Sequence, residues 1–278
     1  MSNLKLTQLR ANLRSMESCL VAYSGGVDSA LLAYLAHEEL GERAVAVIAD
    51  TPSLPRRELA EARQLARKFG FQLREIKTGE FADEEYLANP ANRCFFCKHA
   101  LFDDLKKIAE AEDFAVIAYG ENASDVGDYR PGAQAAAKFA VRAPLKEAGL
   151  SKAEIRQISA ELGLPTADKP EMPCLSSRIP YGEAVTPEKL AMIEAAEIIL
   201  RDRGFRTVRV RHHELCGTSP AALARIEMPP EDMLRLLEQS DEVFAEIREA
   251  GYREVTLDLQ GYRRGSLNEV LKTAQTTD

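Results

Sequence analysis

Ser24-Gly25-Gly26-Val27-Asp28-Ser29 follows the apolar run 19–23 (CLVAY) and precedes the helical pattern 30–35 (ALLAYL). A strand, a glycine turn and a helix in this order aim backbone N–H groups and a helix N-terminus at a bound anion. The two glycines let the backbone approach that anion closely, because no Cβ stands in the way. The carboxylate of Asp28 would repel a phosphate, so the stretch predicts Mg²⁺ between Asp28 and the phosphates of a nucleotide.

The order SGGVDS differs from the kinase-type loop GxxxxGK(S/T) and from the dinucleotide-type loop GxGxxG. It resembles the pyrophosphate-binding loop (PP-loop) of the N-type ATP pyrophosphatases, which cleave ATP between the α and β phosphates and place AMP on a substrate oxygen. An ordinary glycine-containing turn is the alternative. The resemblance implies adenine between the ends of the first two strands and a catalytic Asp28. The expected ATP-binding residues are Ala22, Ser24, Gly25, Gly26, Val27, Asp28, Ser29, Asp50 and Gly120.

Composition narrows the class of protein. The 278 residues are 45% hydrophobic, enough for one large or two smaller cores, and the net charge is −8. An acidic chain argues against a broad nucleic-acid surface, and no apolar run approaches the ~18 residues of a membrane span. The first 19 residues follow an amphipathic helix pattern rather than that of a signal peptide, so we expect a cytoplasmic protein with reduced cysteines.

Alternating strand and helix patterns in the first part of the chain predict an α/β fold, with a Rossmann-like parallel sheet covered on both faces. The ligand of such a sheet binds at the carboxyl ends of its strands. Strands are expected at 19–24, 43–49, 71–77, 114–120 and 138–142, and helices at 4–16, 28–40, 55–69, 98–112 and 151–163.

The pattern breaks at 165–186, a proline-rich segment whose length favours a functional loop. Beyond it a helix, two strands, a helix and a strand predict a smaller α+β domain. We therefore expect a PP-loop domain over 1–180 and a domain for substrate binding and oligomerisation over 186–278. The expected elements of the second domain are 187–203, 205–211, 222–228, 230–250 and 253–258.

Three cysteines form a candidate metal site. Cys94 and Cys97 have C-x-x-C spacing at the start of a helix, beside the basic residues Arg93 and Lys98, and this setting favours thiolates. With Cys174 from the irregular segment they would provide three thiolates and leave one position open. Such a set suits a [4Fe–4S] cluster or zinc, a redox pair or persulfide carrier is another option, and a C-x-x-C without metal is the plain alternative.

Beyond the PP-loop, the stretches 120–136 (GENASDVGDYRPGAQAA), 171–182 (EMPCLSSRIPYG) and 209–213 (RVRHH) together resemble one family over nearly the whole chain. It is the LarE family of ATP-dependent sulfur transferases, which help to build the nickel-pincer nucleotide of lactate racemase. The segment 214–222 departs from the family pattern as an insertion. Within this segment Cys216 receives no role, and the alignment of the acidic residues beyond it is uncertain.

This resemblance implies a substrate, a reaction and a cofactor. ATP would adenylate a carboxylate of pyridinium-3,5-biscarboxylic acid mononucleotide, pyrophosphate would leave, and sulfur would replace the activated oxygen. In one branch of the family the cysteine at the Cys174 position gives up its own sulfur and becomes dehydroalanine. In another branch three cysteines hold a [4Fe–4S] cluster that carries the sulfide, and Cys94, Cys97 and Cys174 place this chain there. The family also implies a homo-oligomer such as a hexamer.

Arginines are the candidates for the substrate phosphate, since a guanidinium binds phosphate in a bidentate manner. Arg209 and Arg211 alternate along one expected strand face and Arg178 lies in the irregular segment, although a solvated basic face is the alternative. Glu197 and Glu227 are weaker candidates for an acidic site. Asp125 or Asp128 could be a second Mg²⁺ ligand or a turn residue. His212 and His213 point to opposite faces of a strand and cannot share a metal.

Three other functions compete with this interpretation. A tRNA thiolase of the same superfamily would need a basic surface, and a GMP or NAD synthetase would need an ammonia source. A nucleotide-binding module without catalysis would bind ATP and never cleave it. Against that module stands Asp28, which suits metal–pyrophosphate chemistry better than simple nucleotide retention.

Overall fold

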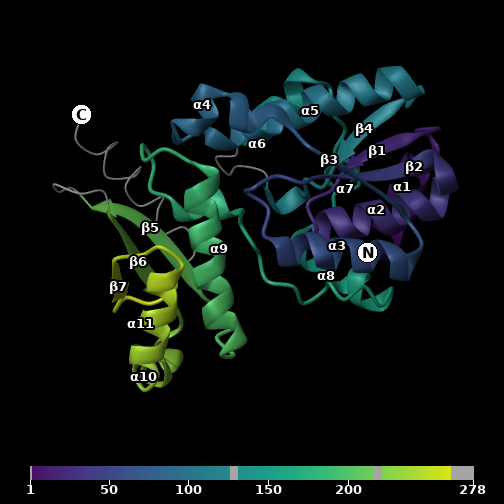
Figure 1. Cartoon of the computed structure of the whole chain (residues 1–278). Coiled ribbons are helices and arrows are strands. Elements are labelled where there is room, and N and C mark those ends of the chain that lie inside the picture. Colours follow the sequence, from purple (N-terminus) through teal and green to yellow (C-terminus); the bar gives the residue numbers. More distant parts are fainter. Residues whose placement is uncertain (1, 126–130, 216–220, 264–278) are drawn as a thin grey trace, which may run out of the picture. The chain divides into compact units, whose positions relative to one another are not determined.

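The computed structural model describes residues 2–125, 131–215 and 221–263, and the chain forms two compact units (Figure 1). Unit 1 consists of Met1–Asp83 and Asn92–Met172, and unit 2 consists of Glu84–Ala91 and Pro173–Asp278. The sequence placed the division between 180 and 186. The structure places it at Met172/Pro173 and gives the short segment Glu84–Ala91 to the second unit.

Unit 1 contains a four-stranded, fully parallel sheet in the order β3-β2-β1-β4. This sheet with its helices confirms the predicted α/β class. The strands are β1 (Cys19–Ala22), β2 (Ala44–Ala49), β3 (Gln72–Ile76) and β4 (Val116–Tyr119). The helices of this unit are α1 (Ser2–Arg14), α2 (Val27–Leu40), α3 (Arg56–Phe69), α5 (Arg93–Glu112), α6 (Pro131–Lys138), α7 (Pro144–Glu147) and α8 (Lys152–Glu161).

Alternate residues of the strands bury apolar side chains on the two faces of this sheet. Val21 of β1 packs into a core formed with α1, α2, α3 and α8, whereas Leu20 packs against α5 and α6. Figure 1 shows α5 and α6 on one side of the sheet and α1, α2, α3 and α8 on the other. Because both faces are covered, the strands are buried and their carboxyl ends remain the place where a ligand can enter.

Two parts of unit 1 differ from the sequence prediction. Residues 138–142 make only an isolated bridge, Ala118 to Arg142, because α6 occupies 131–138 and Ala140 turns the chain with φ +51°. The helix expected at 98–112 begins five residues earlier, at Arg93, with Asn92 as its N-cap. Cys94 and Cys97 therefore lie in the first turns of α5.

Unit 2 contains a three-stranded sheet in the order β5-β6-β7, in which β5 and β6 are antiparallel and β6 and β7 are parallel. Its core lies between this sheet and α9 and α11, and this arrangement confirms the predicted second sheet. The elements are α4 (Glu84–Leu87), α9 (Pro187–Asp202), β5 (Arg209–Leu215), β6 (Ala221–Glu227), α10 (Pro230–Leu237), α11 (Ser240–Glu249) and β7 (Glu254–Leu257). The helix expected at 230–250 is thus two helices, and the strand expected at 205–211 begins at Arg209.

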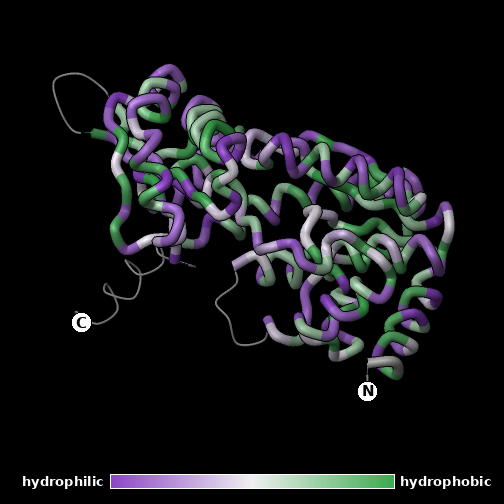
Figure 2. Tube along the Cα trace, turned by 90° about the horizontal axis from the view of Figure 1, so that it is seen from below, coloured by the Kyte–Doolittle hydropathy of each residue, from purple (hydrophilic) through white to green (hydrophobic). Residues whose placement is uncertain are grey.

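The helices carry mixed hydropathy along their length. Figure 2 shows hydrophobic and hydrophilic residues alternating along the helix next to the N-terminus, as expected for a helix with one buried face. None of the described helices is long and apolar enough to cross a membrane.

The first turn of α8 is stabilised by a capping box. Ser151 accepts a hydrogen bond from the backbone N–H of Glu154, and the Glu154 carboxylate accepts one from the backbone N–H of Ser151. The ammonium of Lys5 on α1 also lies 2.7 Å from this carboxylate. The hydrogen bonds from Lys5 and Ser151 lower the pKa of Glu154 to about 2.

We expect the contribution of Glu154 to the stability of unit 1 to depend on pH. Its pKa in the folded chain is below the unfolded value of about 4.3, so the stabilisation is complete above roughly pH 5 and is lost as the pH falls toward 2. The Glu154→Gln variant keeps the capping geometry but loses the ion pair. Its melting temperature should lie below that of the parent at pH 7 and converge with it near pH 2, as measured by thermal unfolding.

Glu161→Gln, at the end of the same helix, is the matched control, because Glu161 accepts a hydrogen bond from Gln157 rather than from a cation. A difference between Glu154→Gln and the parent that persists unchanged to pH 2 would contradict the assignment.

Candidate active site

The PP-loop joins the buried end of β1 to the N-terminus of α2. Gly25 adopts φ +74°, a conformation that glycine reaches without strain. The hydroxyl of Ser29 accepts a hydrogen bond of 3.1 Å from the backbone N–H of Ser24 and donates one of 3.1 Å to the carbonyl of Gly26. Gly26 is the N-cap of α2 and provides no side-chain cap, so the first N–H groups of the helix face the loop without a side-chain acceptor.

Gly120, directly after β4, lets α2 approach the edge of the sheet closely. A Cβ at this position would lie 2.9 Å from the backbone nitrogen of Ser29 and 3.1 Å from the carbonyl carbon of Asp28. Beside this contact lies a cavity of about 190 Å³. Five of the residues that the sequence assigned to ATP line it: Ala22, Ser24, Asp28, Ser29 and Gly120.

Asp28 lies in the first turn of α2 with polar partners on two sides. Its carboxylate accepts a hydrogen bond of 3.2 Å from the side-chain amide of Asn122 and is ion-paired with the ammonium of Lys152. The backbone N–H of Asn122 in turn donates to the carboxylate of Asp125, at 3.1 Å. The carboxylate of Asp125 is thus linked to Asp28 through Asn122 and accepts a hydrogen bond within its own turn. Asp128 lies outside the described residues.

Asp50 follows β2, and its backbone N–H donates to the carbonyl of Ile76 at 2.8 Å. Its carboxylate is ion-paired with Arg56, which also donates to the carbonyls of Thr51 and Leu54, at 2.7 Å each. Arg56 thus fixes the turn after β2, where the resemblance places adenine. Asp50, Gly26 and Val27 do not line the 190 Å³ cavity.

A lysine holds the PP-loop from the side of α3. The ammonium of Lys169 lies 2.6 Å from Glu58 and 2.9 Å from Glu61, and it donates to the carbonyl of Gly25 at 3.3 Å. Gly25 and Lys169 line a second cavity, of about 460 Å³. The sequence predicts one irregular loop at 165–186. The first residues of this segment belong to unit 1 and support the PP-loop.

Several residues that line the 190 Å³ cavity are not among the ATP-binding residues expected from the sequence. Lys98 comes from the first turns of α5, directly after Cys97, and Gly132 comes from α6. Tyr119 and Glu121 flank Gly120, and the carboxylate of Glu121 is ion-paired with Lys146 at 2.8 Å. The position of Lys98 beside the C-x-x-C was visible in the sequence, but its approach to the PP-loop depends on the packing of α5 on the sheet.

The described cysteines differ in environment. Cys19 is fully buried in β1, and burial raises its pKa to about 12, so its thiol is inert at neutral pH. Cys94 is exposed and Cys97 partly exposed, three residues apart on one side of α5. Cys174 is partly exposed in unit 2, and none of these four residues is in a disulfide. Cys216 lies outside the described residues.

Cys174 is the N-cap of the short 3-10 helix Leu175–Arg178. Its carbonyl accepts hydrogen bonds from the backbone N–H of Ser177 at 3.0 Å, from the hydroxyl of Ser177 at 2.7 Å and from the guanidinium of Arg178 at 3.0 Å. Arg178 itself is fully buried and is ion-paired with Glu197 on α9, at 2.8 Å. The guanidinium proposed for a substrate phosphate thus has its partners inside unit 2.

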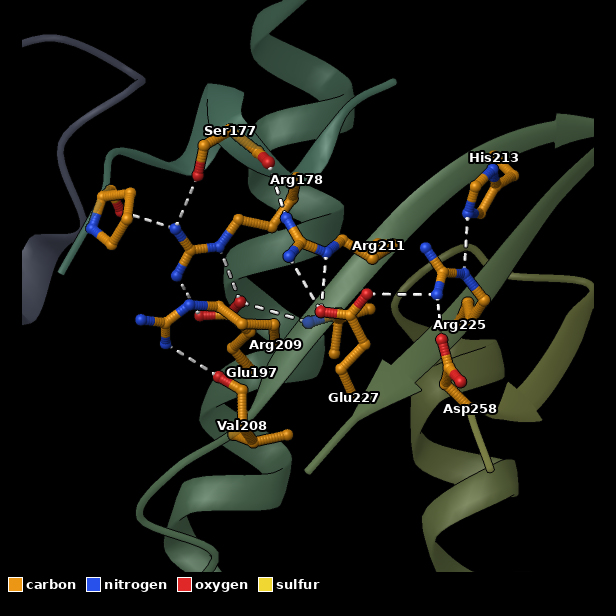
Figure 3. A network of polar contacts seen from close by, with 12 residues as sticks. Ser177, Arg178, Glu197, Val208, Arg209, Arg211, His213, Arg225, Glu227 and Asp258 are labelled. Atoms are coloured by element: carbon orange, nitrogen blue, oxygen red, sulfur yellow. Dashed lines mark hydrogen bonds and ion pairs between the residues drawn. The ribbon is translucent and has the colours of Figure 1, made fainter. Parts of the chain in front are cut away.

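A network of arginines and carboxylates continues from this loop across the sheet (Figure 3). Arg211 donates to the carbonyl of Ser177 at 2.7 Å and pairs with Glu227 at 2.8 Å. Glu227 also pairs with Arg225, at 3.1 Å. Glu197 and Glu227 are both fully buried, so the acidic residues that the sequence noted are paired with internal arginines.

Burial and neighbouring charges shift the pKa values of Arg209 and Glu197 in this network. Burial opposes ionisation of Glu197, but Arg178 and Arg201 hold its pKa below the ordinary value. Burial and the neighbouring charge of Arg178 lower the pKa of Arg209 to about 10. Its guanidinium contacts the carbonyl of Val208 at 3.0 Å and lies over the ring of Tyr262. A buried cation whose pKa falls is the kind of group that an anionic ligand would stabilise.

The two histidines of β5 face opposite sides of the strand. His212 is buried against Tyr252, and burial lowers its pKa to about 4. His213 accepts a hydrogen bond from Arg225 at 3.2 Å. Neither side chain is placed to chelate a metal together with the other.

The donor groups of the chain suit the expected cofactors to different degrees. The carboxylate of Asp28 and the hydroxyls of Ser24 and Ser29 are hard oxygen ligands around a cavity that Gly120 leaves open, and this set fits Mg²⁺ with nucleotide phosphates. Cys94, Cys97 and Cys174 are thiols of the type that hold an iron–sulfur cluster. Within the described ranges, no three His, Cys, Asp or Glu side chains are grouped to hold a metal ion.

Comparisons with known proteins agree with this geometry. Residues 5–88 match the model of the NAD synthase family. An uncharacterized protein of Synechocystis is 46% identical over 269 residues, which cover 96% of this chain and 98% of that protein. A glutamine-hydrolyzing GMP synthase chain of Methanopyrus kandleri is 28% identical over 205 residues, which cover 68% of this chain and 64% of that protein.

A second relative is similar over nearly the whole chain. The pyridinium-3,5-bisthiocarboxylic acid mononucleotide synthase of Lactiplantibacillus plantarum is 34% identical over 272 residues, which cover 98% of this chain and 96% of that protein. The similarity thus extends through the PP-loop, the loop at 173–178 that contains Cys174 (the Cys174 loop) and the second unit. The chain belongs to the LarE family of ATP-dependent sulfur transferases, within the PP-loop superfamily.

Proposed function

We propose that this protein uses ATP to adenylate a carboxylate of pyridinium-3,5-biscarboxylic acid mononucleotide and then replaces the activated oxygen by sulfur. The observation that carries the proposal is the 190 Å³ cavity, which gathers Ala22, Ser24, Asp28, Ser29 and Gly120 at the carboxyl edge of the sheet. The full-length similarity to a synthase of the bisthiocarboxylic acid mononucleotide supports this substrate.

The first step is adenylation. A carboxylate oxygen of the substrate attacks the α-phosphorus of ATP, the bond from that phosphorus to the β-phosphate oxygen breaks, and pyrophosphate leaves with the electron pair. The backbone N–H groups of the PP-loop stabilise the charge on the departing pyrophosphate. Asp28 would hold Mg²⁺, which would supply neutralisation of phosphate charge, and Asn122 links Asp28 to Asp125.

The second step is the transfer of sulfur. A sulfur nucleophile attacks the acyl carbon of the adenylate, and the carbon–oxygen bond to AMP breaks. We propose that Cys94, Cys97 and Cys174 hold a [4Fe–4S] cluster, which supplies bound sulfide when present. Donation of the Cys174 sulfur itself, leaving dehydroalanine, is the alternative.

Substrate recognition is assigned to the second unit. Arg209 and Arg211 lie two residues apart on β5, and the lowered pKa of Arg209 supports an anion nearby. We propose that these two guanidinium groups bind the phosphate of the mononucleotide.

Asp28→Asn should abolish adenylation while leaving the fold intact. The amide keeps the size of the side chain but loses the negative charge that holds the metal, so the rate of pyrophosphate release should fall by roughly 10²-fold or more. Pyrophosphate release is measured with ATP, Mg²⁺ and the biscarboxylic acid mononucleotide.

The matched control for this variant is Asp103→Asn, which removes a carboxylate from an exposed ion pair with Lys107 on α5. If Asp28→Asn and the control both released pyrophosphate at the parent rate, Asp28 would have no part in the mechanism.

The cysteines can be tested by metal content and turnover. If the cluster is the sulfur carrier, protein purified without oxygen should contain about four irons and four acid-labile sulfides per chain, with absorbance near ~400 nm. Cys94→Ala and Cys97→Ala should lose iron and multiple turnover, and Cys174→Ala should lose all sulfur transfer. Iron analysis, spectroscopy and product quantification by mass spectrometry give these readouts.

Cys19→Ala is the control, because this buried thiol belongs to the core of β1. Full multiple turnover by Cys94→Ala or Cys97→Ala contradicts the cluster. Iron-free parent protein in which Cys174 loses the mass of H₂S after a single turnover would instead establish the sacrificial route.

A further inference from the structure

The backbone at Cys174 is held by several hydrogen bonds. Its carbonyl oxygen has three donors, from the backbone and hydroxyl of Ser177 and the guanidinium of Arg178. The same nitrogen of Arg178 also donates to the carbonyl of Pro173 and to the hydroxyl of Ser177. The peptide units on both sides of Cys174 are therefore fixed, while its side chain remains partly exposed.

The guanidinium of Arg178 is fixed from its opposite edge. Its Nε and Nη2 donate to the two carboxylate oxygens of Glu197, at 2.8 and 3.1 Å, in a bidentate pair that is fully buried. Glu197 in turn accepts from the backbone N–H of Val210 on β5 and pairs with Arg201. Figure 3 shows the guanidinium of Arg178 between Ser177 and Glu197.

The rest of the loop is anchored within the same unit. Tyr86 shares a hydrogen bond of 2.9 Å with Ser176, and Asn89 donates to the carbonyl of Pro180 at 2.7 Å. Arg211 donates to the carbonyl of Ser177. These contacts hold the residues after Cys174. Among the interactions described above, Ser177 and Arg178 both contact the carbonyl of Cys174, and Arg178 also contacts the carbonyl of Pro173.

We propose that Arg178 is a positioning residue for Cys174, and that Glu197 fixes the direction of its guanidinium. The pair sets the backbone of Cys174, and thereby the direction in which the sulfur is presented. Its importance for catalysis rests on the proposed function, because it matters only if sulfur leaves or passes through Cys174. It gives Arg178 a role different from binding the substrate phosphate.

Arg178→Lys tests this role most sharply. An ammonium keeps a positive charge beside Glu197 but has no planar fork that can reach the carboxylate and the two carbonyls together. Ser177→Ala is the second variant; it removes one donor to the Cys174 carbonyl and leaves the buried ion pair in place. Arg201→Met is the matched control, since it removes another cation from Glu197 without touching the loop.

Two readouts do not depend on sulfur transfer. The first is the rate at which iodoacetamide alkylates Cys174, with the peptide that contains Cys94 as an internal reference. The second is hydrogen exchange at the amide of Ser177, which donates to the Cys174 carbonyl. A role confined to stability would lower the melting temperature of all three variants and leave both readouts in folded protein unchanged.

We expect Arg178→Lys and Ser177→Ala to raise Cys174 alkylation and hydrogen exchange at the amide of residue 177 by roughly threefold or more, because the loop opens locally. The kcat for sulfur transfer should fall by roughly tenfold or more, with adenylation and the KM for ATP unchanged. Arg201→Met should match the parent in alkylation, exchange and kcat.

Parent-like alkylation and exchange in both folded variants would overturn the role of Arg178. If the parent adenylates but transfers no sulfur, the proposed function fails, while the alkylation and exchange results still decide whether the pair positions Cys174.

Discussion

The approach of α2 to the end of β4 is the constraint on which the nucleotide site depends. Residue 120 can carry no side chain, because a Cβ would meet the backbone of Asp28 and Ser29. The same closeness brings Asn122 to the carboxylate of Asp28 and lets Lys98 and Glu121 line one cavity with the loop. Lys169 holds the other side of the loop through Gly25. The loop is therefore shaped in advance by packing, which is what a site for pyrophosphate and metal requires.

Buried charge organises the second unit in a comparable way. Glu197 and Glu227 are without exposure to solvent, and a carboxylate in such a place is stable only beside cations and hydrogen-bond donors. Each carboxylate connects different elements: Glu197 joins α9 to the loop at Cys174 and to β5, and Glu227 joins β6 to β5. Removing either partner of such a pair would leave an uncompensated buried charge, so the observed arrangement of the loop is tied to these ion pairs.

The sequence predicted the sheet, the PP-loop and most helices because these depend on local patterns: an apolar run, a glycine pair and helical periodicity. It did not predict that Arg178 would be buried against Glu197, because both the solvated and the buried arginine look the same in a sequence. It predicted Cys94 and Cys97 at the start of a helix, but it set the first residue of that helix at 98 rather than at Arg93. Lys98 and Arg56 were missed as parts of the site because their roles depend on tertiary packing.

The segment Glu84–Ala91 has a consequence for how the protein is made. It belongs to unit 2, where Tyr86 and Asn89 satisfy groups at Ser176, Ile179, Pro180 and Glu183, yet the next part of that unit begins only at Pro173. About 80 residues of unit 1 are synthesised in between, which takes roughly 4–16 s at ribosomal rates. During that interval the residues whose carbonyls accept hydrogen bonds from Asn89 have not yet been synthesised. The nascent chain must therefore complete unit 1 while the segment Glu84–Ala91 still lacks the rest of unit 2. A fragment starting at Pro173 would lack the residues that hold the loop at Cys174.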